Sequence, residues 1–283
     1  MSTAVILPAR NEEMFLSRTL SHLLRQTIEP KKIIVINDGS QDKTRNIALN
    51  FEAVEVIDIT RDSHEYAVHA PILAQIINQG LKKIFNDDFE YVIILGSDHL
   101  IPPHYLSTII EKMKKDNKVV ICSGQIRGER SVVLRGSGRV VKYDFWKKIG
   151  LLYPENYGFE TYLLIKAAMM GYKVRILNEL VTSTQRKTGK NYGRNTFLSK
   201  GKAIKALGYS RLYSTVKISL VTLRNPSAGI SMLQGYLSSN VSPYEQDLRK
   251  YLNRIQHKRI KKYIINPLQF FNEDKRKGFE EDG

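Results

Sequence analysis

Two acidic residues stand immediately after short apolar runs that are typical of β-strands. Asp98 follows the run Tyr91–Leu95, and Asp38 follows the run Ile33–Ile36. In an open α/β sheet the carboxyl ends of the strands form the edge at which ligands bind. A carboxylate at this edge, such as Asp98 with His99 beside it, suits a hard cation such as Mg²⁺ or Mn²⁺. The plainer alternatives are that both aspartates only stabilise turns and that His99 is a surface histidine.

The usual glycine-rich phosphate-binding loops are absent from the sequence. No G-x-G-x-x-G follows the first apolar run, and no G-x-x-x-x-G-K occurs. Such loops hold phosphates with backbone N–H groups at the start of a helix. A bound nucleotide would therefore have to be held by side chains and a metal ion.

Strand and helix patterns alternate along the chain and would position these residues. Asn11 could cap the helix after the first strand, with Glu12 and Glu13 in its first turn. This alternation predicts an α/β fold with a mostly parallel sheet flanked by helices. We expect strands at residues 3–7, 33–36, 54–59, 91–95, 119–123 and 173–177, helices between most of them, and a loop over 60–70.

Composition indicates a globular protein with a sizeable core. The chain has 283 residues, of which 42% are hydrophobic. The single cysteine, Cys122, lies in an apolar run, so we expect a buried thiol and a reducing compartment. The N-terminus has no basic region typical of a signal peptide, and no apolar stretch approaches the ~20 residues of a membrane span.

Positive charge is concentrated in the last third of the chain. The net charge is +16, and residues 186–262 contain 17 Lys or Arg against two acids. The pattern over 248–263 predicts an amphipathic helix with a basic face. Such a surface favours an anionic partner, and we expect a membrane surface. No nucleic-acid-binding motif accompanies the charge, so no specific nucleic-acid partner is expected.

Several motifs together resemble family 2 glycosyltransferases. The segment 5–13 (VILPARNEE) is similar to the family's opening motif, and 35–44 (VINDGSQDKT) is similar to its D-D-G-S motif. Leu95-Gly-Ser-Asp98 occupies the place of its L-D-A-D. Gly158-Phe-Glu-Thr-Tyr162 and Gly171-Tyr-Lys-Val174 are similar to its G-x-E-D helix and following strand. These segments occur in the family's order and cover about residues 3–180.

The resemblance implies a GT-A (Rossmann-like) fold and a nucleotide-sugar donor, linked to UDP or GDP. It also implies inversion at the anomeric carbon in a single displacement. Asp98 would hold Mn²⁺ or Mg²⁺ against the donor's diphosphate, and His99 could be a further ligand. The residues implied to bind the nucleotide sugar are Pro8, Arg10, Glu12, Asp38, Ser40 and Ser97.

The sequence departs from the family at three positions. Arg10 stands where an aromatic residue is common, and Gly96 replaces the first aspartate of the metal motif. Thr161 stands where the family places its catalytic aspartate, so Thr161 itself cannot remove a proton from a sugar hydroxyl. Either Glu160 acts as the base, or the acceptor is already anionic and needs none.

The second possibility resembles polyprenyl-phosphate sugar synthases, a branch of the same family. Arg186 and Lys190 resemble that branch's basic segment and could bind an acceptor phosphate, or could form a solvated loop. Leu100 stands where that branch usually has Gln, which is a mismatch. The segment 200–210 resembles glycosyltransferases of surface-polysaccharide synthesis instead, which keeps a lipid-linked glycan acceptor open.

We therefore expect a glycosyltransferase that acts on a lipid-linked acceptor. It would be cytoplasmic and peripheral at the inner face of the cell membrane. The expected organisation is a catalytic GT-A domain over 1–185, a basic helical extension over 186–270 and a tail over 271–283. The alternative is a GT-A module that has lost catalysis and binds a nucleotide sugar or a protein partner, since Gly96 and Thr161 both remove carboxylates.

Overall fold

The computed structural model describes residues 1–60, 70–128, 134–186 and 193–265. The chain forms two compact units. The first comprises residues 1–65, 75–153 and 171–188, and the second comprises 66–74, 154–170 and 189–283. The segment 154–170, which we placed in the first domain, is therefore grouped with the C-terminal helices. The expected tail over 271–283 and most of the expected loop over 60–70 lie outside the described residues.

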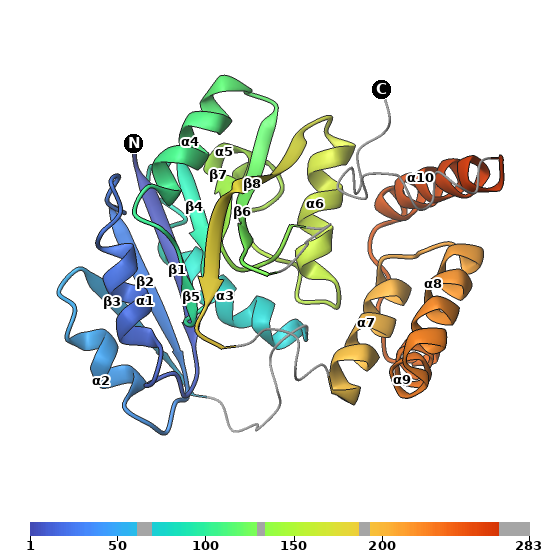
Figure 1. The fold of residues 1–283 in the computed structure, drawn as a ribbon, viewed down its shortest axis with the longest axis horizontal. Coiled ribbons are helices and arrows are strands. Elements are labelled where there is room, and N and C mark those ends of the chain that lie inside the picture. The colour runs from blue at the N-terminus through green and yellow to red at the C-terminus, as the bar shows by residue number, and fades with distance from the viewer. Residues whose placement is uncertain (61–69, 129–133, 187–192, 266–283) are drawn as a thin grey trace. The chain divides into compact units, whose positions relative to one another are not determined.

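The first unit is built on a twisted sheet with the strand order β3-β2-β1-β4-β7-β6-β8-β5 (Figure 1). Strands β3, β2, β1 and β4 are parallel neighbours, β7 is antiparallel to both β4 and β6, and β6 is parallel to β8. The strands are β1 (Thr3–Ala9), β2 (Lys32–Asp38), β3 (Val54–Ile59), β4 (Tyr91–Ile94), β5 (His99–Leu100), β6 (Val119–Ile126), β7 (Arg139–Lys142) and β8 (Lys173–Thr184).

Both faces of the sheet are covered by helices because its central strands are apolar on both sides. One set of alternate residues, including Val5 and Leu7, packs against α1 (Leu16–Leu23), α2 (Thr44–Leu49) and α4 (Tyr105–Lys115). On the other face α3 (Pro71–Lys83) lies against Ile6, and a Cβ on Gly80 would stand 2.8 Å from that side chain. A short helix, α5 (Tyr143–Lys148), follows β7.

The second unit is helical and has its own core. The helices are α6 (Phe159–Met169), α7 (Arg194–Ala206), α8 (Arg211–Arg224), α9 (Pro226–Leu237) and α10 (Gln246–Ile265). Leu248 and Leu252 of α10 are buried with Ile165 of α6, whereas Lys250 and Arg254 are exposed. The predicted amphipathic basic helix is thus confirmed, and its apolar face is covered by the chain itself. Within the part of the chain that the structure describes, no helix has the length and apolar character needed to span a bilayer.

Helices α7 and α9 pack closely because glycine occupies their contact. A Cβ added at Gly201 would lie 1.9 Å from the carbonyl oxygen of Met232, and one at Gly235 would lie 2.0 Å from that of Leu198. Any side chain at these positions would push the two backbones apart. The separation of α7 and α9 is therefore fixed by two glycines.

Most of the predicted strands and their order are confirmed. The strand expected at 173–177 is longer and extends to Thr184, and strands β5 and β7 were not predicted. Helix α1 begins at Leu16, so the prediction that Asn11 caps it is wrong. Cys122 is a buried, free thiol, as expected, and burial raises its pKa to about 12.

Candidate active site

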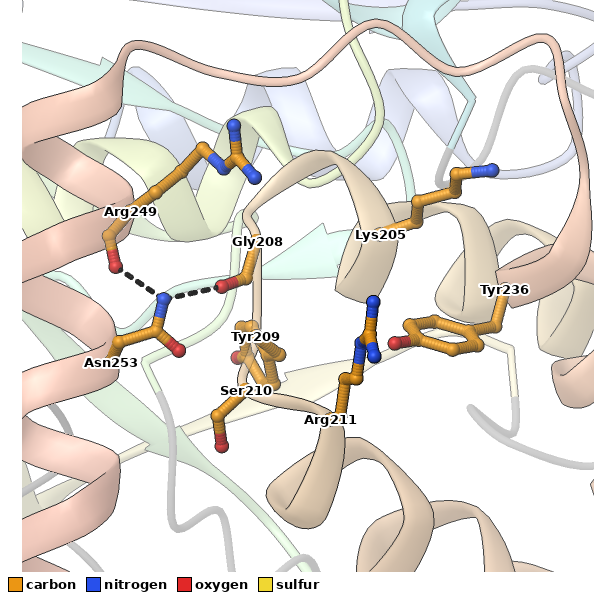
Figure 2. Close-up of a pocket in the computed structure, with 8 residues that line it drawn as sticks. All are labelled: Lys205, Gly208, Tyr209, Ser210, Arg211, Tyr236, Arg249 and Asn253. Atoms are coloured by element: carbon orange, nitrogen blue, oxygen red, sulfur yellow. Dashed lines mark hydrogen bonds between the residues drawn. The ribbon is translucent and has the colours of Figure 1, made fainter.

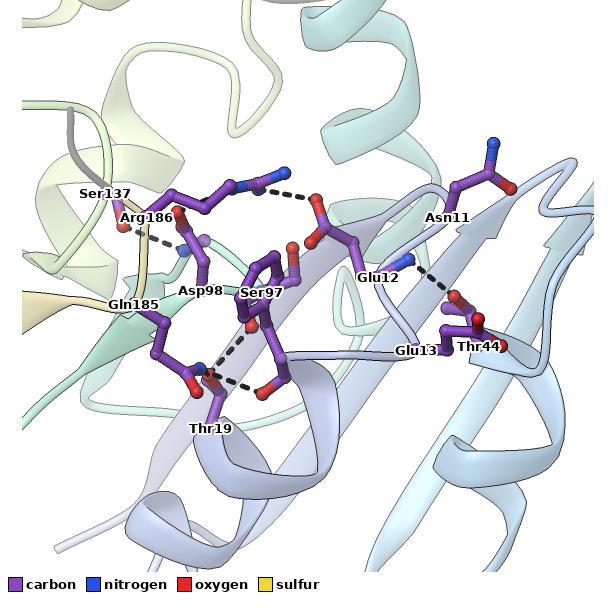
Figure 3. Close-up of polar contacts among 12 residues, drawn as sticks. Asn11, Glu12, Glu13, Thr19, Thr44, Ser97, Asp98, Ser137, Gln185 and Arg186 are labelled. Atoms are coloured by element: carbon purple, nitrogen blue, oxygen red, sulfur yellow. Dashed lines mark hydrogen bonds and ion pairs between the residues drawn. The ribbon is translucent and has the colours of Figure 1, made fainter. Parts of the chain in front are cut away.

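The predicted edge residues come together where β1, β2, β4 and β8 end. Figure 3 shows the loops after these strands meeting around Glu12, Asp98 and Arg186. Pro8 lies on β1 just before its end, and Ser97 is buried in the loop after β4. All of these residues belong to the first unit.

The loops after β1 and β2 are joined by hydrogen bonds between their motif residues. The backbone N–H of Asn11 donates to Ser40 Oγ at 3.1 Å, and Asn11 Oδ1 accepts from the N–H of Gln41 at 2.8 Å. The N–H of Glu12 donates to Thr44 Oγ1 at 2.6 Å. Asn11 adopts a left-handed backbone conformation (φ 53°), which asparagine tolerates better than most residues. Asn11 therefore joins the two loops, and Ser40 helps to hold them together.

Arg10 and Asp38 form a second contact between the same loops. Asp38 is the last residue of β2 and is 2% exposed. Arg10 Nη1 donates to the Asp38 carbonyl oxygen at 3.0 Å and lies 3.6 Å from its carboxylate. The guanidinium of Arg10 offsets the buried negative charge and is itself partly exposed. Arg10 stands at the position where the family usually has an aromatic ring.

Arg186 bridges the two other carboxylates of the site (Figure 3). Its Nη2 donates to Glu12 Oε1 at 2.6 Å, and its Nε donates to Asp98 Oδ2 at 3.0 Å. The guanidinium also lies over the ring of Phe15, 5.1 Å from its centre. Charge-assisted bonds of this kind are short and directional. One arginine that follows β8 therefore connects the loops after β1 and β4.

The pKa values of this group reflect burial competing with ion pairing. Burial raises the pKa of Glu12, and the nearby charge of Asp98 adds to the effect, while the bond from Arg186 opposes both. Burial would by itself lower the pKa of Arg186, but its bonds to Asp98 and Glu12 outweigh that effect and raise it. The three charges therefore depend on one another, and replacing any one of them changes the other two.

A second set of bonds fixes the loop that carries Asp98. The side-chain amide of Gln185 donates to the carbonyl of Phe15 at 2.9 Å and to Thr19 Oγ1 at 3.1 Å. Thr19 Oγ1 in turn donates to the carbonyl of Ser97 at 2.7 Å. The N–H of Gln185 donates to the carbonyl of Asp98 at 2.8 Å. Sequence reasoning did not identify Gln185 or Thr19, because their partners lie far away along the chain.

His99 is buried beside this loop and is hydrogen-bonded at both ring nitrogens. Nδ1 lies 2.6 Å from Ser137 Oγ, and Nε2 lies 2.8 Å from Thr182 Oγ1. Burial lowers the pKa of His99 to about 4, so the ring is neutral near pH 7. In this geometry His99 positions the loop after β4. Its assignment as a metal ligand stays a prediction. Binding a metal through a ring nitrogen would break the hydrogen bond to Ser137 or to Thr182.

Ser137 also fills the space next to Gly96. The N–H of Gly96 donates to Ser137 Oγ at 2.8 Å, and a Cβ at Gly96 would lie 3.1 Å from that oxygen. Residues Ser137 and Thr182 were not among the predicted site residues. Gly96 thus replaces the first aspartate of the metal motif, and the Ser137 hydroxyl occupies the space beside it.

The donor set near Asp98 is compatible with a divalent cation. Among the residues that the structure describes, no cluster of three or more His, Cys, Asp or Glu could hold a metal by protein ligands alone. Mg²⁺ and Mn²⁺, however, bind through one or two carboxylates together with substrate phosphates. The side chain of Asp98 is 18% exposed, and its partner is the cationic Arg186. A metal held jointly by Asp98 and a diphosphate fits this arrangement.

The remaining predicted residues are not among those that form this cluster. Glu160 and Thr161 occupy the first turn of α6 in the second unit, after Gly158 in a left-handed conformation (φ 82°). The N–H of Thr161 donates to the carbonyl of Gly158 at 2.9 Å. Lys190 lies outside the described residues. The structure therefore supports the donor-side cluster in detail, whereas the roles of Glu160, Thr161 and Lys190 stay predictions.

Sequence comparison assigns the family. The model of Glycosyl transferase family 2 matches residues 4–181, so the chain belongs to this family. The poly-beta-1,6-N-acetyl-D-glucosamine synthase of Staphylococcus aureus (strain COL) is 28% identical over 153 residues, which is 52% of this chain and 33% of that protein. The chain thus spans about one third of the length of that curated relative.

Solved structures share the fold at low sequence identity. A mannosyltransferase from Pyrobaculum calidifontis in complex with GDP-Man and Mn²⁺ superposes with a TM-score of 0.58 at 15% identity, covering 96% of this chain and 83% of that one. TarS 1–349 of S. aureus in complex with UDP-GlcNAc gives 0.55 at 15% identity, covering 94% and 76%. The predicted family and the GT-A fold with C-terminal helices are thereby confirmed.

Proposed function

We propose that this protein transfers a sugar, with inversion, from a UDP- or GDP-linked donor to a lipid-linked acceptor at the cytosolic membrane face. The observation that carries the proposal is the contact in which Arg186 bridges Glu12 and Asp98, beside the Arg10–Asp38 pair. This charged group lies at the ligand-binding edge of a family 2 sheet. In the reaction an acceptor oxygen attacks the anomeric carbon, and the bond to the diphosphate oxygen breaks.

The donor's nucleoside would lie between the loops after β1 and β2. The buried carboxylate of Asp38 can accept a hydrogen bond from a base N–H, and Arg10 can stack on the base. Glu12 can accept from ribose hydroxyls. Pro8, Ser40 and Ser97 would line the same pocket. These roles are supported by the hydrogen bonds that hold the two loops in one arrangement.

Asp98 would hold Mn²⁺ or Mg²⁺ on the donor side, with His99 as a second ligand. The bound cation would neutralise the charge that develops on the leaving diphosphate. Arg186 supplies a positive charge at the same position, within 3.0 Å of Asp98. The guanidinium can form paired hydrogen bonds with phosphate oxygens, whether of the donor or of the acceptor.

The acceptor is proposed to be a polyprenyl phosphate or a lipid-linked glycan. Thr161 cannot serve as a base, so a phosphate acceptor that is already anionic would need no proton removed. Glu160 is the candidate base if the acceptor is a hydroxyl. Arg186 and Lys190 would hold the acceptor phosphate. The absence of a carboxylate at position 161 is what favours the phosphate.

A membrane surface is proposed as a partner because the second unit is both basic and apolar on its outside. Residues 186–262 contain 17 Lys or Arg and two acids. Helix α8 also exposes an apolar stripe, Leu212, Val216, Leu220 and Leu223, of which Leu223 is 82% exposed. Basic residues attract anionic lipid, and exposed leucines can enter its interface.

The second candidate is a non-catalytic nucleotide-sugar-binding module. Two features favour it: Gly96 and Thr161 replace carboxylates of the family motifs. Such a module would bind a nucleotide sugar without releasing the nucleoside diphosphate.

Thermal unfolding with UDP- and GDP-sugars, each with Mn²⁺ or with EDTA, tests the proposal. One nucleotide should raise the melting temperature in the presence of Mn²⁺, and the nucleoside diphosphate should be released slowly by hydrolysis. Stabilisation without any release, even with added polyprenyl phosphate, would favour the non-catalytic module. No stabilisation by any donor would contradict both.

A further inference from the structure

The second unit contains a cavity of about 320 Å³ whose lining is strongly cationic. Figure 2 shows Lys205, Arg211 and Arg249 around it, with the rings of Tyr209 and Tyr236. These residues come from α7, α8, α9 and α10 and from the turn that joins α7 to α8. No acidic side chain is present among the residues that line the cavity. The lining therefore combines three positive charges with hydroxyl groups.

Arg249 lies in the wall of this cavity in a place that only glycine permits. A Cβ on Gly208 would stand 2.5 Å from Arg249 Nε, and Gly208 has a φ of +69°, which also favours glycine. The amide of Asn253 donates to the carbonyls of Gly208 and Arg249, at 3.1 Å and 2.9 Å. Figure 2 shows both bonds. The backbone beneath the Arg249 side chain is thus fixed.

The Nε of Arg249 is buried and has no hydrogen-bond partner. A buried donor left without an acceptor destabilises the folded state, so native structures seldom contain one. In the part of the chain that the structure describes, neither Arg211 nor Arg249 forms an ion pair, and the nearby Glu245 is paired with Lys166. Lys205 donates to the carbonyl of Ser238 and is in no ion pair with the residues that the structure describes. The lining of the cavity therefore carries no negative charge, and Arg249 Nε lacks an acceptor.

An anion with several oxygen atoms would supply both the missing negative charge and an acceptor for Arg249 Nε. Three cations around one small cavity repel one another, and a dianion offsets that repulsion better than a single carboxylate does. Guanidinium groups pair with phosphate oxygens through two parallel bonds. Burial raises the pKa of Tyr209 to about 12, so its hydroxyl remains protonated. The cavity is at the lower end of ligand-pocket volumes, which suits a phosphate or diphosphate group.

We propose that the cavity formed by Lys205, Arg211 and Arg249 binds a phosphate or diphosphate group. All of its residues belong to the second unit, whereas Glu12, Asp98 and Arg186 belong to the first. The proposed site therefore shares no residue with the donor-side cluster. The phosphate could be carried by a soluble molecule or by a lipid headgroup.

Calorimetric titration of the full chain with pyrophosphate, at constant ionic strength in chloride, tests this site. We expect binding that Arg249→Gln weakens by about tenfold or more, since a charge-assisted pair to phosphate is lost. Arg211→Gln is the second variant, because Arg211 is exposed at the start of α8 and its replacement should not disturb folding. Lys250→Gln, which removes the exposed neighbouring charge on α10, should bind like the wild type.

Vesicles of phosphatidylcholine with and without phosphatidate distinguish the two sources. If Arg249→Gln reduces binding to phosphatidate vesicles and pyrophosphate competes for it, the phosphate belongs to a lipid. If pyrophosphate binding depends on Arg249 while vesicle binding does not, the ligand is soluble. Equal losses in Arg249→Gln and Lys250→Gln would indicate diffuse electrostatics and overturn the site. So would the absence of any binding of pyrophosphate and phosphatidate by the wild type.

Discussion

At the carboxyl edge of the first unit each arginine faces carboxylates, whereas the arginines of the second-unit cavity face none among the described residues. Arg186 is bonded to Glu12 and Asp98 within 3.0 Å. Arg249 has a buried Nε without an acceptor. In the first-unit cluster the positive charge of Arg186 is already balanced by carboxylates, so an anionic ligand must replace existing bonds. We call such a cluster compensated. An uncompensated cluster gains from an anion directly, so the two sites should respond differently to charge removal.

The largest effect is expected when the compensated site loses Asp98. Asp98→Asn keeps the size of the side chain but removes its charge, so both the bond to Arg186 and the proposed metal contact weaken. We expect sugar transfer or donor hydrolysis to fall by about two to three orders of magnitude, as when a single group that stabilises transition-state charge is removed. Turnover is measured by the release of nucleoside diphosphate.

Asp88→Asn is the matched control, since Asp88 is exposed and lies before the start of β4, whereas Asp98 follows the end of that strand. It should retain full turnover. Circular dichroism should show that Asp98→Asn remains folded, because Asp98 lies in a polar loop. Turnover close to that of the wild type in Asp98→Asn would remove Asp98 from the proposed metal site.

The second effect concerns the neutral histidine that supports the Asp98 loop. The pKa of His99 is about 4 in the folded protein and about 6.5 when unfolded. Between these values the unfolded chain binds more protons, so His99 contributes stability above pH 6.5 that is lost as the pH falls toward 4. The shift corresponds to about 3 kcal/mol over that range. Urea unfolding at pH 7 and at pH 5 measures the larger part of this difference, about 2 kcal/mol.

His99→Gln is the comparison, because glutamine can bond to Ser137 and Thr182 but does not titrate. The variant should be less stable than the wild type at pH 7, and the difference should shrink as the pH falls. A difference that is the same at both pH values would mean that protonation of His99 is not coupled to unfolding.

The third prediction tests the helix packing that shapes the second-unit cavity. Lys205 lies on α7 and Tyr236 on α9, and the two helices meet at Gly201 and Gly235. Gly201→Ala should destabilise the protein by about 2 kcal/mol, since overpacking outweighs the gain in helix propensity. Gly193→Ala is the control, because a Cβ there would meet nothing within 4 Å. Equal stability of the two variants, measured by urea unfolding, would contradict the close packing.

The two sites also differ in how far the sequence predicted them. Asp38 and Asp98 follow strand patterns directly, so a local signal placed them at the sheet edge, whereas Glu12 was predicted from the family's opening motif. Ser137 and Thr182 could not be found in this way, because they meet His99 across 38 and 83 residues. Contacts between distant segments leave no local pattern in one sequence. Strand β7 was missed because its four residues adjoin a glycine-rich segment that indicated a flexible connection.

In the second unit the sequence showed charge but not its arrangement. The basic composition of 186–262 predicted an anionic partner, yet nothing distinguished Arg249 from the exposed Lys250 beside it. What distinguishes them is Gly208, which lies 41 positions earlier and admits the Arg249 side chain. Helical periodicity did predict the buried stripe of Leu248, Leu252 and Ile255, because that signal is local.

The smallest effect is predicted for Arg186→Gln, which removes the positive charge of the cluster instead of a negative one. This change leaves Glu12 and Asp98 facing each other without their cation, so the pKa of Glu12 should rise further. If Arg186 also binds the acceptor phosphate, the acceptor's KM should rise about tenfold more than the donor's, the effect of one lost charge-assisted bond. Steady-state kinetics with each substrate varied in turn measures both constants, and Arg186→Lys should recover part of the loss. Equal changes in the two constants would assign Arg186 to the donor's diphosphate alone. In that case the donor's diphosphate would bind in the first unit by displacing carboxylates from Arg186. A phosphate that binds in the second-unit cavity would not have to displace a carboxylate.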